Sequence, residues 1–381
     1  MSKAFLSKEQ TRTLWLKSQG LSESNPFGSG PKATVKAIQH LGYVQIDTIN
    51  VIERSHHHIL YSRIPDYKRS HLHKAQSKDK TVFEYWTHAL AYAATDDFKY
   101  FINDMKRRQK NPSQWYSSVT EADVKKMLAT VKKQGPISIR DVTDDVLEEK
   151  KHPWGSKKPS KKFLQCGFNG GELVIAERLG MLKKYDLTER HFNWSKRPKA
   201  ATPKEVTEYK LDRALKAQGV ISLDSAAYME KAEPKKEILK AIETRVRKGT
   251  LIPVQVKELE RVHFWAEPEL LESIPEDVNH LTHILSPFDP LVIQRKRFHM
   301  FFDYDHRFEA YVPKEKRKYG YFTLPVIIGD QAVAVLDLKT DRQKQELLIQ
   351  QWSWLGKHKS KANKTLIEQE LHRFEKFQLD K

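Results

Sequence analysis

Three features of the sequence predict a mixed α+β fold built from small repeated units. A rhythm of helix, turn, helix, helix and hairpin occurs at least twice between residues 113 and 280. This order of elements is typical of winged-helix units, in which a helix-turn-helix precedes a β-hairpin. From residue 281 onward the chain is rich in Val, Ile, Tyr and Phe, which favours a small antiparallel β-barrel. A chain of 381 residues has room for roughly two to four such units.

We therefore expect four consecutive segments. The first winged-helix unit covers residues 1–112, the second covers 113–200, and the third, with a β-hairpin wing, covers 201–280. Residues 281–381 form the C-terminal β-barrel.

The first segment is expected to begin with helices. Ser7 is a suitable N-cap for KEQTRTLWLKSQ, and Gly20 is a suitable stop. The stretch KATVKAIQHLG has the periodicity of a second helix, and YVQIDTI alternates as a strand does. The apolar and aromatic run VFEYWTHALAYAA is interpreted as the start of a buried helix, and DDFKYFINDMKRRQK as an amphipathic helix with a basic end.

The later segments carry clearer local signals. Thr120 and Asp123 predict a capping box at a helix start. The stretches LATVKKQGPISIRDV and RALKAQGVISLDSAAYM share one pattern: a helix, a Gln-Gly turn, Ile-Ser and a helix start. Further on, LIPVQV and RVHFWA predict the two strands of a hairpin. In the last segment, Gly329 and Asp330 predict a hairpin turn within VIIGDQAVAVLDL, and KTLIEQELHRFEKFQL predicts a closing amphipathic helix.

The charge balance predicts a polyanionic partner. The chain has 67 Lys and Arg against 49 Asp and Glu, a net charge of +18. A cation near a phosphate releases a condensed counterion, so such an excess favours nucleic-acid binding. The alternative is a basic surface without a specific partner.

Other composition features exclude several classes of protein. The single cysteine, Cys166, excludes an internal disulfide, and no Cys/His cluster has zinc-ligand spacing. The N-terminus lacks a signal peptide, and no window has the roughly 18 apolar residues that a membrane span needs. We expect a monomeric cytoplasmic protein, associated with the nucleoid, that uses no metal and no cofactor.

Gln45 and Asp47 are the candidate catalytic pair. On a strand their side chains would point the same way, with Cα atoms about 7 Å apart. An amide and a carboxylate at that spacing can hold one water, or the carboxylate can face a developing positive charge. Spacing alone favours two simpler interpretations, a solvent-facing strand edge or an aspartate that caps the next turn. An N7-alkylated purine is already cationic, however, and leaves without a general acid, so this pair would suffice for its excision.

The histidine run that follows has two interpretations. Consecutive residues point apart, so His56, His57 and His58 do not suit a single metal ion. We expect them to contact phosphates or to support the neighbouring strand, and Arg54 and Arg63 are phosphate-contact candidates.

Glu84 and His88 lie in the aromatic run that starts at residue 82. This run serves either core packing or the wall of a cleft, and in the second case His88 would contact DNA.

Two basic clusters are further candidates for DNA binding. The first contains Arg295 and Arg297, and the second contains Lys316, Arg317 and Lys318, followed by tyrosines. Cations interleaved with aromatic rings suit a phosphate backbone with adjacent bases. The alternative is a solvated charged face.

Several long motifs resemble one family. These are LGYVQIDTINVIERSHHHILYSRIPDY, VFEYWTHA, LSPFDPLVIQRKR, DYDHRFEAYVPKEKRKYGYFTLPVIIGD and VAVLDLKTDR. Together, and over nearly the whole chain, they resemble the AlkZ-like (YcaQ-type) DNA glycosylases. The chain departs from the family pattern at Pro290 and Gln294, which puts a detailed role for that loop in question.

The resemblance implies tandem winged-helix units followed by a β-barrel, and excision of N7-alkylated purines, including the unhooking of interstrand crosslinks. The Gln-x-Asp motif of one branch falls on Gln45 and Asp47, and this branch accepts broader substrates than the Gln-x-Gln branch. The hairpin around 251–266 would probe the duplex.

The expected function is therefore that of a monofunctional DNA glycosylase acting on double-stranded DNA with alkylated purines or crosslinks. Asp47 would activate water or stabilise the sugar cation, and Gln45 would orient that water or the backbone of the lesion. A crosslinked base cannot leave its partner freely, so we expect an open channel. The alternative is a non-catalytic winged-helix regulator, although such proteins usually dimerise and no dimerisation helix is evident.

Overall fold

The computed structural model describes residues 3–144, 157–272, 274 and 280–380 and divides the chain into two compact units. Unit 1 contains residues 1–68 and 207–381, and unit 2 contains residues 69–206. The four predicted segments remain a prediction, and these compact units divide the chain in another way, because they cut the first segment after residue 68. No helix of the described residues is long and apolar enough to cross a bilayer.

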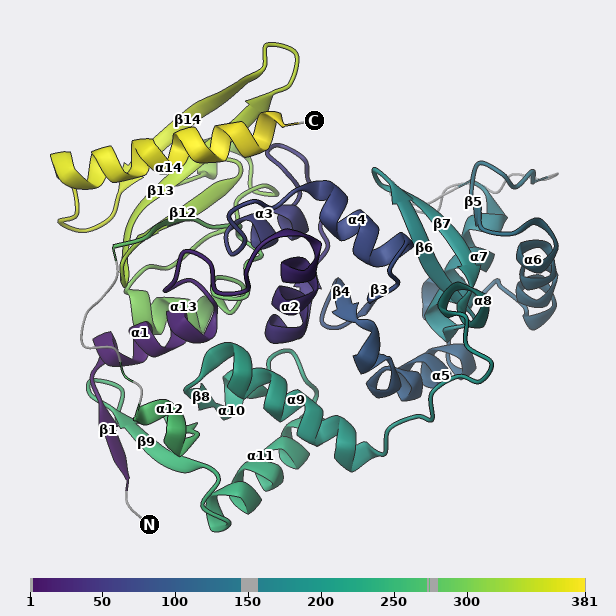
Figure 1. Ribbon diagram of the computed structural model, residues 1–381, viewed down its shortest axis with the longest axis horizontal. Helices are drawn as coiled ribbons and strands as arrows, with labels where there is room; N and C mark the ends of the chain where they lie inside the picture. The colour runs from purple at the N-terminus through teal and green to yellow at the C-terminus, as the bar shows by residue number, and fades with distance from the viewer. Residues whose placement is uncertain (1–2, 145–156, 273, 275–279, 381) are drawn as a thin grey trace. The chain divides into compact units, whose positions relative to one another are not determined.

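Unit 1 contains the N-terminal helices and the C-terminal sheet (Figure 1). Its helices are α1 (Lys8–Ser18), α2 (Gly30–Leu41), α3 (Ser55–Tyr61), α9 (Pro203–Gln218), α10 (Leu223–Ala226), α11 (Ala232–Arg247), α12 (Pro268–Leu271), α13 (Arg295–Phe302), α14 (Lys361–Leu379) and the 3-10 turn η3 (Lys314–Lys316). Its strands are β1 (Ala4–Leu6), β2 (Val44–Gln45), β8 (Ile221–Ser222), β9 (Ile252–Val256), β10 (Phe264–Ala266), β11 (Thr282–Ile284), β12 (Thr323–Ile328), β13 (Gln331–Asp341) and β14 (Glu346–Trp354).

Unit 2 contains helices and short antiparallel strands that share one hydrophobic core. Its helices are α4 (Arg69–Ser77), α5 (Ile102–Lys110), α6 (Glu121–Gln134), α7 (Pro159–Gly170), α8 (Thr188–Phe192) and the 3-10 turns η1 (Thr95–Tyr100) and η2 (Gln114–Tyr116). Its strands are β3 (Val82–Trp86), β4 (Leu90–Ala94), β5 (Ile137–Ser138), β6 (Leu173–Leu179) and β7 (Leu182–Leu187).

Two stretches have a similar order of elements. The described residues of unit 2 run α6, β5, α7 and the β6–β7 hairpin, and unit 1 runs α9, β8, α10, α11 and the β9–β10 hairpin. In unit 2, β5 pairs antiparallel with β7, the second strand of the β6–β7 hairpin. In unit 1, β8 pairs in the same way with β10, the second strand of the β9–β10 hairpin. The middle helix predicted for the second segment falls in part on residues 145–156, outside the described residues. The name winged helix stays our prediction for both stretches.

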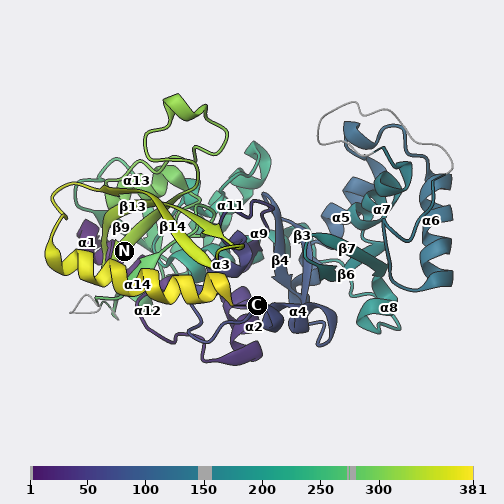
Figure 2. The same ribbon diagram turned by 90° about the horizontal axis from the view of Figure 1, so that it is seen from above.

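The C-terminal sheet corrects one prediction. It is a four-stranded antiparallel sheet in the order β11-β12-β13-β14, and the described residues show no closed barrel. Helix α14 runs alongside these strands in both views (Figures 1 and 2). The mixed α+β class is confirmed, and so is the hairpin turn at Gly329 and Asp330.

The run at 82–94 was interpreted wrongly as a helix start. It forms β3 and β4, which pair antiparallel with Phe83 opposite Ala93. Phe83 and Tyr85 are buried in the core of unit 2 with Phe98, Phe168 and Leu164. Periodicity cannot separate a short buried strand from a buried helix, because both are apolar on several sides.

Candidate active site

The segment between α2 and α3 carries both candidate catalytic residues. Helix α2 ends at Leu41, and Gly42 caps it in a left-handed conformation with φ of 76°. A Cβ at this position would collide with the side chain of Arg213, so glycine is required here. Val44 is fully buried and Ile46 nearly so, and these two residues anchor the segment in the core.

The strand prediction holds only for Val44 and Gln45, where β2 lies. Gln45 is buried, as are its neighbours Val44 and Ile46, whereas Asp47 is half-buried and Thr48 is exposed. Strand alternation therefore does not set the direction of the Asp47 side chain.

A turn sets the direction of Asp47 instead. Its Oδ1 accepts a hydrogen bond from the backbone N–H of Ile49 at 2.7 Å, which is the geometry of an Asx turn. Oδ2 accepts no hydrogen bond from any residue in the described part of the chain. Burial raises the pKa of the Asp47 carboxyl above its ordinary value, and the Ile49 N–H acts in the opposite direction. The aspartate thus caps a turn with one oxygen and keeps the other available.

The three histidines lie on helix α3, which contacts β2, and His58 reaches strand β11. His58 is fully buried, its Nε2 lies 2.7 Å from the carbonyl oxygen of Ile284, and its ring packs 4.7 Å from that of Phe374. Burial lowers the pKa of His58 to about 4, so the ring is neutral at pH 7. A buried neutral imidazole does not serve as a phosphate contact, and His58 supports the fold.

The other two histidines face different surroundings. His57 is half-buried, and its Nδ1 lies 2.7 Å from the hydroxyl of Tyr67. His56 is 3% exposed, and its ring centroid lies 4.3 Å from that of His57. Arg54 caps α3, with a side chain that is 22% exposed. In the described residues, no group of three or more His, Cys, Asp or Glu could hold a metal ion.

Arg63 is a structural residue in this fold, which corrects its assignment as a phosphate contact. Its guanidinium donates to both carboxylate oxygens of Asp289 at 2.7 and 2.9 Å, and both side chains are fully buried. Its remaining N–H groups reach the carbonyl and side-chain oxygens of Gln19 and the carbonyl of Ile59. All five donors of Arg63 are therefore used inside the protein.

The first basic cluster is also directed inward. Arg297 is 5% exposed, lies over the Trp15 ring at 4.3 Å and donates to the carbonyl of Val220, and burial lowers its pKa to about 9. Arg295 is half-buried and donates to the carbonyls of Val292 and Pro287, and burial lowers its pKa to about 10. These contacts replace the expected contacts with DNA.

The second basic cluster is exposed. Lys316 and Lys318 are exposed and Arg317 is half-exposed, with its guanidinium 4.9 Å from the Tyr321 ring centroid. None of these three cations forms an ion pair with an acidic side chain of the described residues. Tyr311, which is 77% exposed, precedes them.

Two buried carboxylates fix the backbone of this loop. Glu309 accepts the N–H groups of Lys318 and Tyr319, both at 2.8 Å. Asp337 of β13 accepts the N–H groups of Tyr321 and Phe322 at 2.8 and 3.0 Å. The loop is thus held to the sheet by its backbone, and its basic side chains remain available to solvent.

Glu84 and His88 belong to unit 2. Glu84 is fully buried and forms a bidentate ion pair with Arg178, whose Nε and Nη2 lie 2.5 and 2.6 Å from Oε1 and Oε2 of Glu84. It is therefore a core residue. His88 is half-buried in the turn between β3 and β4.

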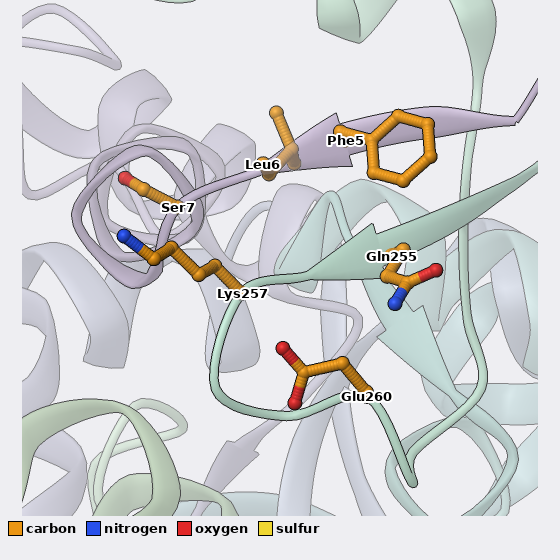
Figure 3. Close-up of a pocket in the computed structure, with 6 residues that line it drawn as sticks. All are labelled: Phe5, Leu6, Ser7, Gln255, Lys257 and Glu260. Atoms are coloured by element: carbon orange, nitrogen blue, oxygen red, sulfur yellow. The ribbon is translucent and has the colours of Figure 1, made fainter.

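A separate depression of about 380 Å³ lies beside β1 and β9 (Figure 3). Its lining residues are Phe5, Leu6, Ser7, Gln255, Lys257 and Glu260. Neither Gln45 nor Asp47 contributes to it, so it is not the candidate active site.

The sequence-based search missed the residues that hold the segment after Asp47. These are Arg342 in the turn between β13 and β14, and Gln378 on α14, which contact residues 50–53. Arg342 is separated from Asn50 by 292 positions in the chain, so no local pattern could have revealed the contact.

Comparison with known proteins identifies a family and similar solved structures. The family model described as DNA glycosylase AlkZ-like matches residues 38–377. The solved structure of DNA glycosylase AlkZ from Streptomyces sahachiroi is similar to this chain with a TM-score of 0.62 at 15% identity. The match covers 99% of this chain and 97% of that chain. At this identity the structural match supports the fold and assigns no residue roles.

Proposed function

Because this chain belongs to the AlkZ-like family of DNA glycosylases, we propose that it hydrolyses the N-glycosidic bond of N7-alkylated purines in double-stranded DNA. Its substrates include purines joined in interstrand crosslinks. Asp47 and Gln45 carry the reaction, and the enzyme is monofunctional, with water as the nucleophile.

The hydrogen bonding of the Asp47 carboxyl is the observation that supports this proposal most strongly. Its turn fixes the carboxyl through Oδ1, while Oδ2 accepts no hydrogen bond from the described residues. The half-buried position strengthens the electrostatic effect of the carboxylate on a nearby cation, because the local dielectric constant is lower than in water.

An N7-alkylated purine suits this simple site. The alkylated base carries a positive charge and leaves as a neutral molecule, so its departure needs no proton from the protein. Charge then develops on the sugar, where an anionic carboxylate stabilises it or accepts a proton from the attacking water. The buried amide of Gln45 would position that water.

The DNA-binding surface of the proposal centres on the basic loop with Lys316, Arg317 and Lys318, which offers free cations beside Tyr321. The partly exposed residues Arg54, His57 and His88 remain candidates for further DNA contacts. The proposed set excludes the buried side chains of His56, His58, Arg63 and Arg297.

An end-point assay tests the proposed activity. A duplex with one N7-methylguanine is incubated with the protein, and half of the sample is then heated with alkali. We expect strand cleavage only in the alkali-treated half, because a monofunctional glycosylase leaves an intact abasic strand. An unchanged duplex in both halves would contradict the enzyme and favour the DNA-binding regulator. Cleavage without alkali would contradict the monofunctional reaction.

A further inference from the structure

Residues 50–53, which follow the Asp47 turn, form no helix or strand of their own. They connect this turn to the N-terminus of α3, which begins at Ser55. Their polar backbone groups need partners from elsewhere, because ordered buried peptide groups are costly without hydrogen bonds. The C-terminal part of unit 1 supplies these partners.

Arg342 makes three contacts to this segment from the turn between β13 and β14. Its Nη1 donates to the carbonyl oxygen of Asn50 at 3.0 Å. Its Nη2 donates to Oδ1 of Asn50 at 2.9 Å and to the carbonyl oxygen of Ile52 at 3.3 Å. One planar side chain therefore fixes two peptide groups and one side chain.

Thr340 and Gln378 fix the residues between and after these contacts. The backbone N–H of Thr340 donates to the carbonyl oxygen of Val51 at 2.9 Å. The side-chain oxygen of Gln378 accepts the N–H of Glu53 at 2.6 Å and the hydroxyl of Thr340 at 3.1 Å. Glu53, Thr340 and Gln378 are all buried, so water does not compete with these bonds.

The Asp47 turn is therefore held at both ends. Buried Val44 and Ile46 hold it on one side, and the Arg342 contacts to Asn50 hold it on the other. A carboxylate that must face one sugar carbon depends on such restraint, because a displacement of about 1 Å can lower a rate about a hundredfold.

We propose that Arg342 is a positioning residue for base excision, which holds residues 50–52 and thereby the Asp47 turn in its reactive geometry. This inference rests on the proposed role of Asp47. The guanidinium fork is the required feature, and positive charge alone does not replace it.

Single-turnover excision from an N7-methylguanine duplex at saturating enzyme tests the proposal. We expect Arg342→Ala and Arg342→Lys both to lower the rate constant about 10- to 100-fold, with the Kd for DNA unchanged. Lys344→Ala is the matched control, because Lys344 is an exposed cation of the same turn, and its rate should equal that of the wild type. Thermal melting checks that each variant is folded, and Arg342→Lys decides the question if the alanine variant melts early.

The pH profile separates positioning from a general loss of structure. A looser turn admits water around Asp47, so the acidic limb of the rate profile should move to lower pH in both Arg342 variants. A wild-type rate in Arg342→Lys overturns the proposal, as does a weaker Kd with an unchanged rate constant, which would make Arg342 a phosphate contact. A wild-type protein that releases no base contradicts the proposed function itself, and this outcome is distinct from the others.

Discussion

Asp47 combines two environments that act in opposite directions on a carboxylate. Burial favours the neutral acid, whereas the N–H of Ile49 favours the anion, and burial has the larger effect on its pKa. The sequence proposed this residue as a catalytic candidate on a strand, whereas the structure places it in a turn after β2. Its position depends on a turn, which is one of the two simpler interpretations that spacing alone favoured. The cap uses Oδ1, which leaves Oδ2 for the proposed catalytic role.

The rate of excision should depend on pH through Asp47. The ionised carboxylate is the active form, so the single-turnover rate should fall as the pH drops through its pKa. Because that pKa is raised, the fall should begin at a higher pH than the ordinary aspartate value of 3.8 implies. A rate profile that stays flat down to pH 4 would contradict an Asp47 that is both raised in pKa and catalytic.

The same pKa shift predicts that Asp47→Asn does not destabilise the protein. A carboxyl with a raised folded-state pKa contributes stability below its unfolded pKa, and this contribution is lost as the pH rises through the folded value. Asparagine resembles the neutral acid and can still accept the Ile49 N–H. Urea unfolding at pH 7 should show the variant at least as stable as the wild type, and this difference should shrink at low pH. A loss of about 1 kcal/mol or more at pH 7 would contradict this account.

At the scale of elements, short sequence motifs correctly predicted the helix starts and hairpins that neighbouring residues determine. The capping boxes at Ser7 and Thr120 are present, with the Gln10 and Asp123 side chains returning to the cap backbone. The hairpins β9–β10 and β12–β13 form where turn residues separate apolar runs. In contrast, α3 was missed because its histidines hide the helical pattern, and its stability comes from distant packing against Ile284 and Phe374.

Ion pairs between residues far apart in the chain explain why other residues were assigned wrongly. Arg63 looked like a surface cation, because its partner Asp289 lies 226 positions away. Breaking this fully buried pair should leave an uncompensated charge, so Asp289→Ala should lower the free energy of unfolding by about 3–5 kcal/mol in urea titrations.

The control for this experiment is the pair of Lys8 with Asp303, whose aspartate is 75% exposed. Asp303→Ala should cost less than about 1 kcal/mol. Equal effects of the two substitutions would show that the Arg63–Asp289 pair does not organise the fold.

At the scale of the whole molecule, the net charge of +18 predicts strongly salt-dependent DNA binding. Log Kd should rise linearly with log salt concentration, since each phosphate contact releases about 0.9 counterions. Replacing Lys316, Arg317 and Lys318 together by alanine should reduce the slope by about 2 to 3, as measured by fluorescence anisotropy between 50 and 200 mM salt.

A second triple variant controls for net charge alone. Lys357, Lys359 and Lys361 are exposed and lie in a run that we interpret as a solvated face. Their replacement by alanine should leave the slope nearly unchanged. If both triple variants reduce the slope equally, DNA contacts are spread over the surface and the loop has no special role.

The single-turnover rate of Asp47→Asn tests the central claim most directly. An N7-methylguanine duplex is mixed with excess enzyme at a concentration above the measured Kd, and Asp224→Asn, whose side chain is 87% exposed, serves as the matched control. We predict that Asp47→Asn binds the duplex as the wild type does but excises the base at least about 100-fold more slowly, while the control is unaffected. Excision by Asp47→Asn at the wild-type rate would contradict the role of this carboxylate.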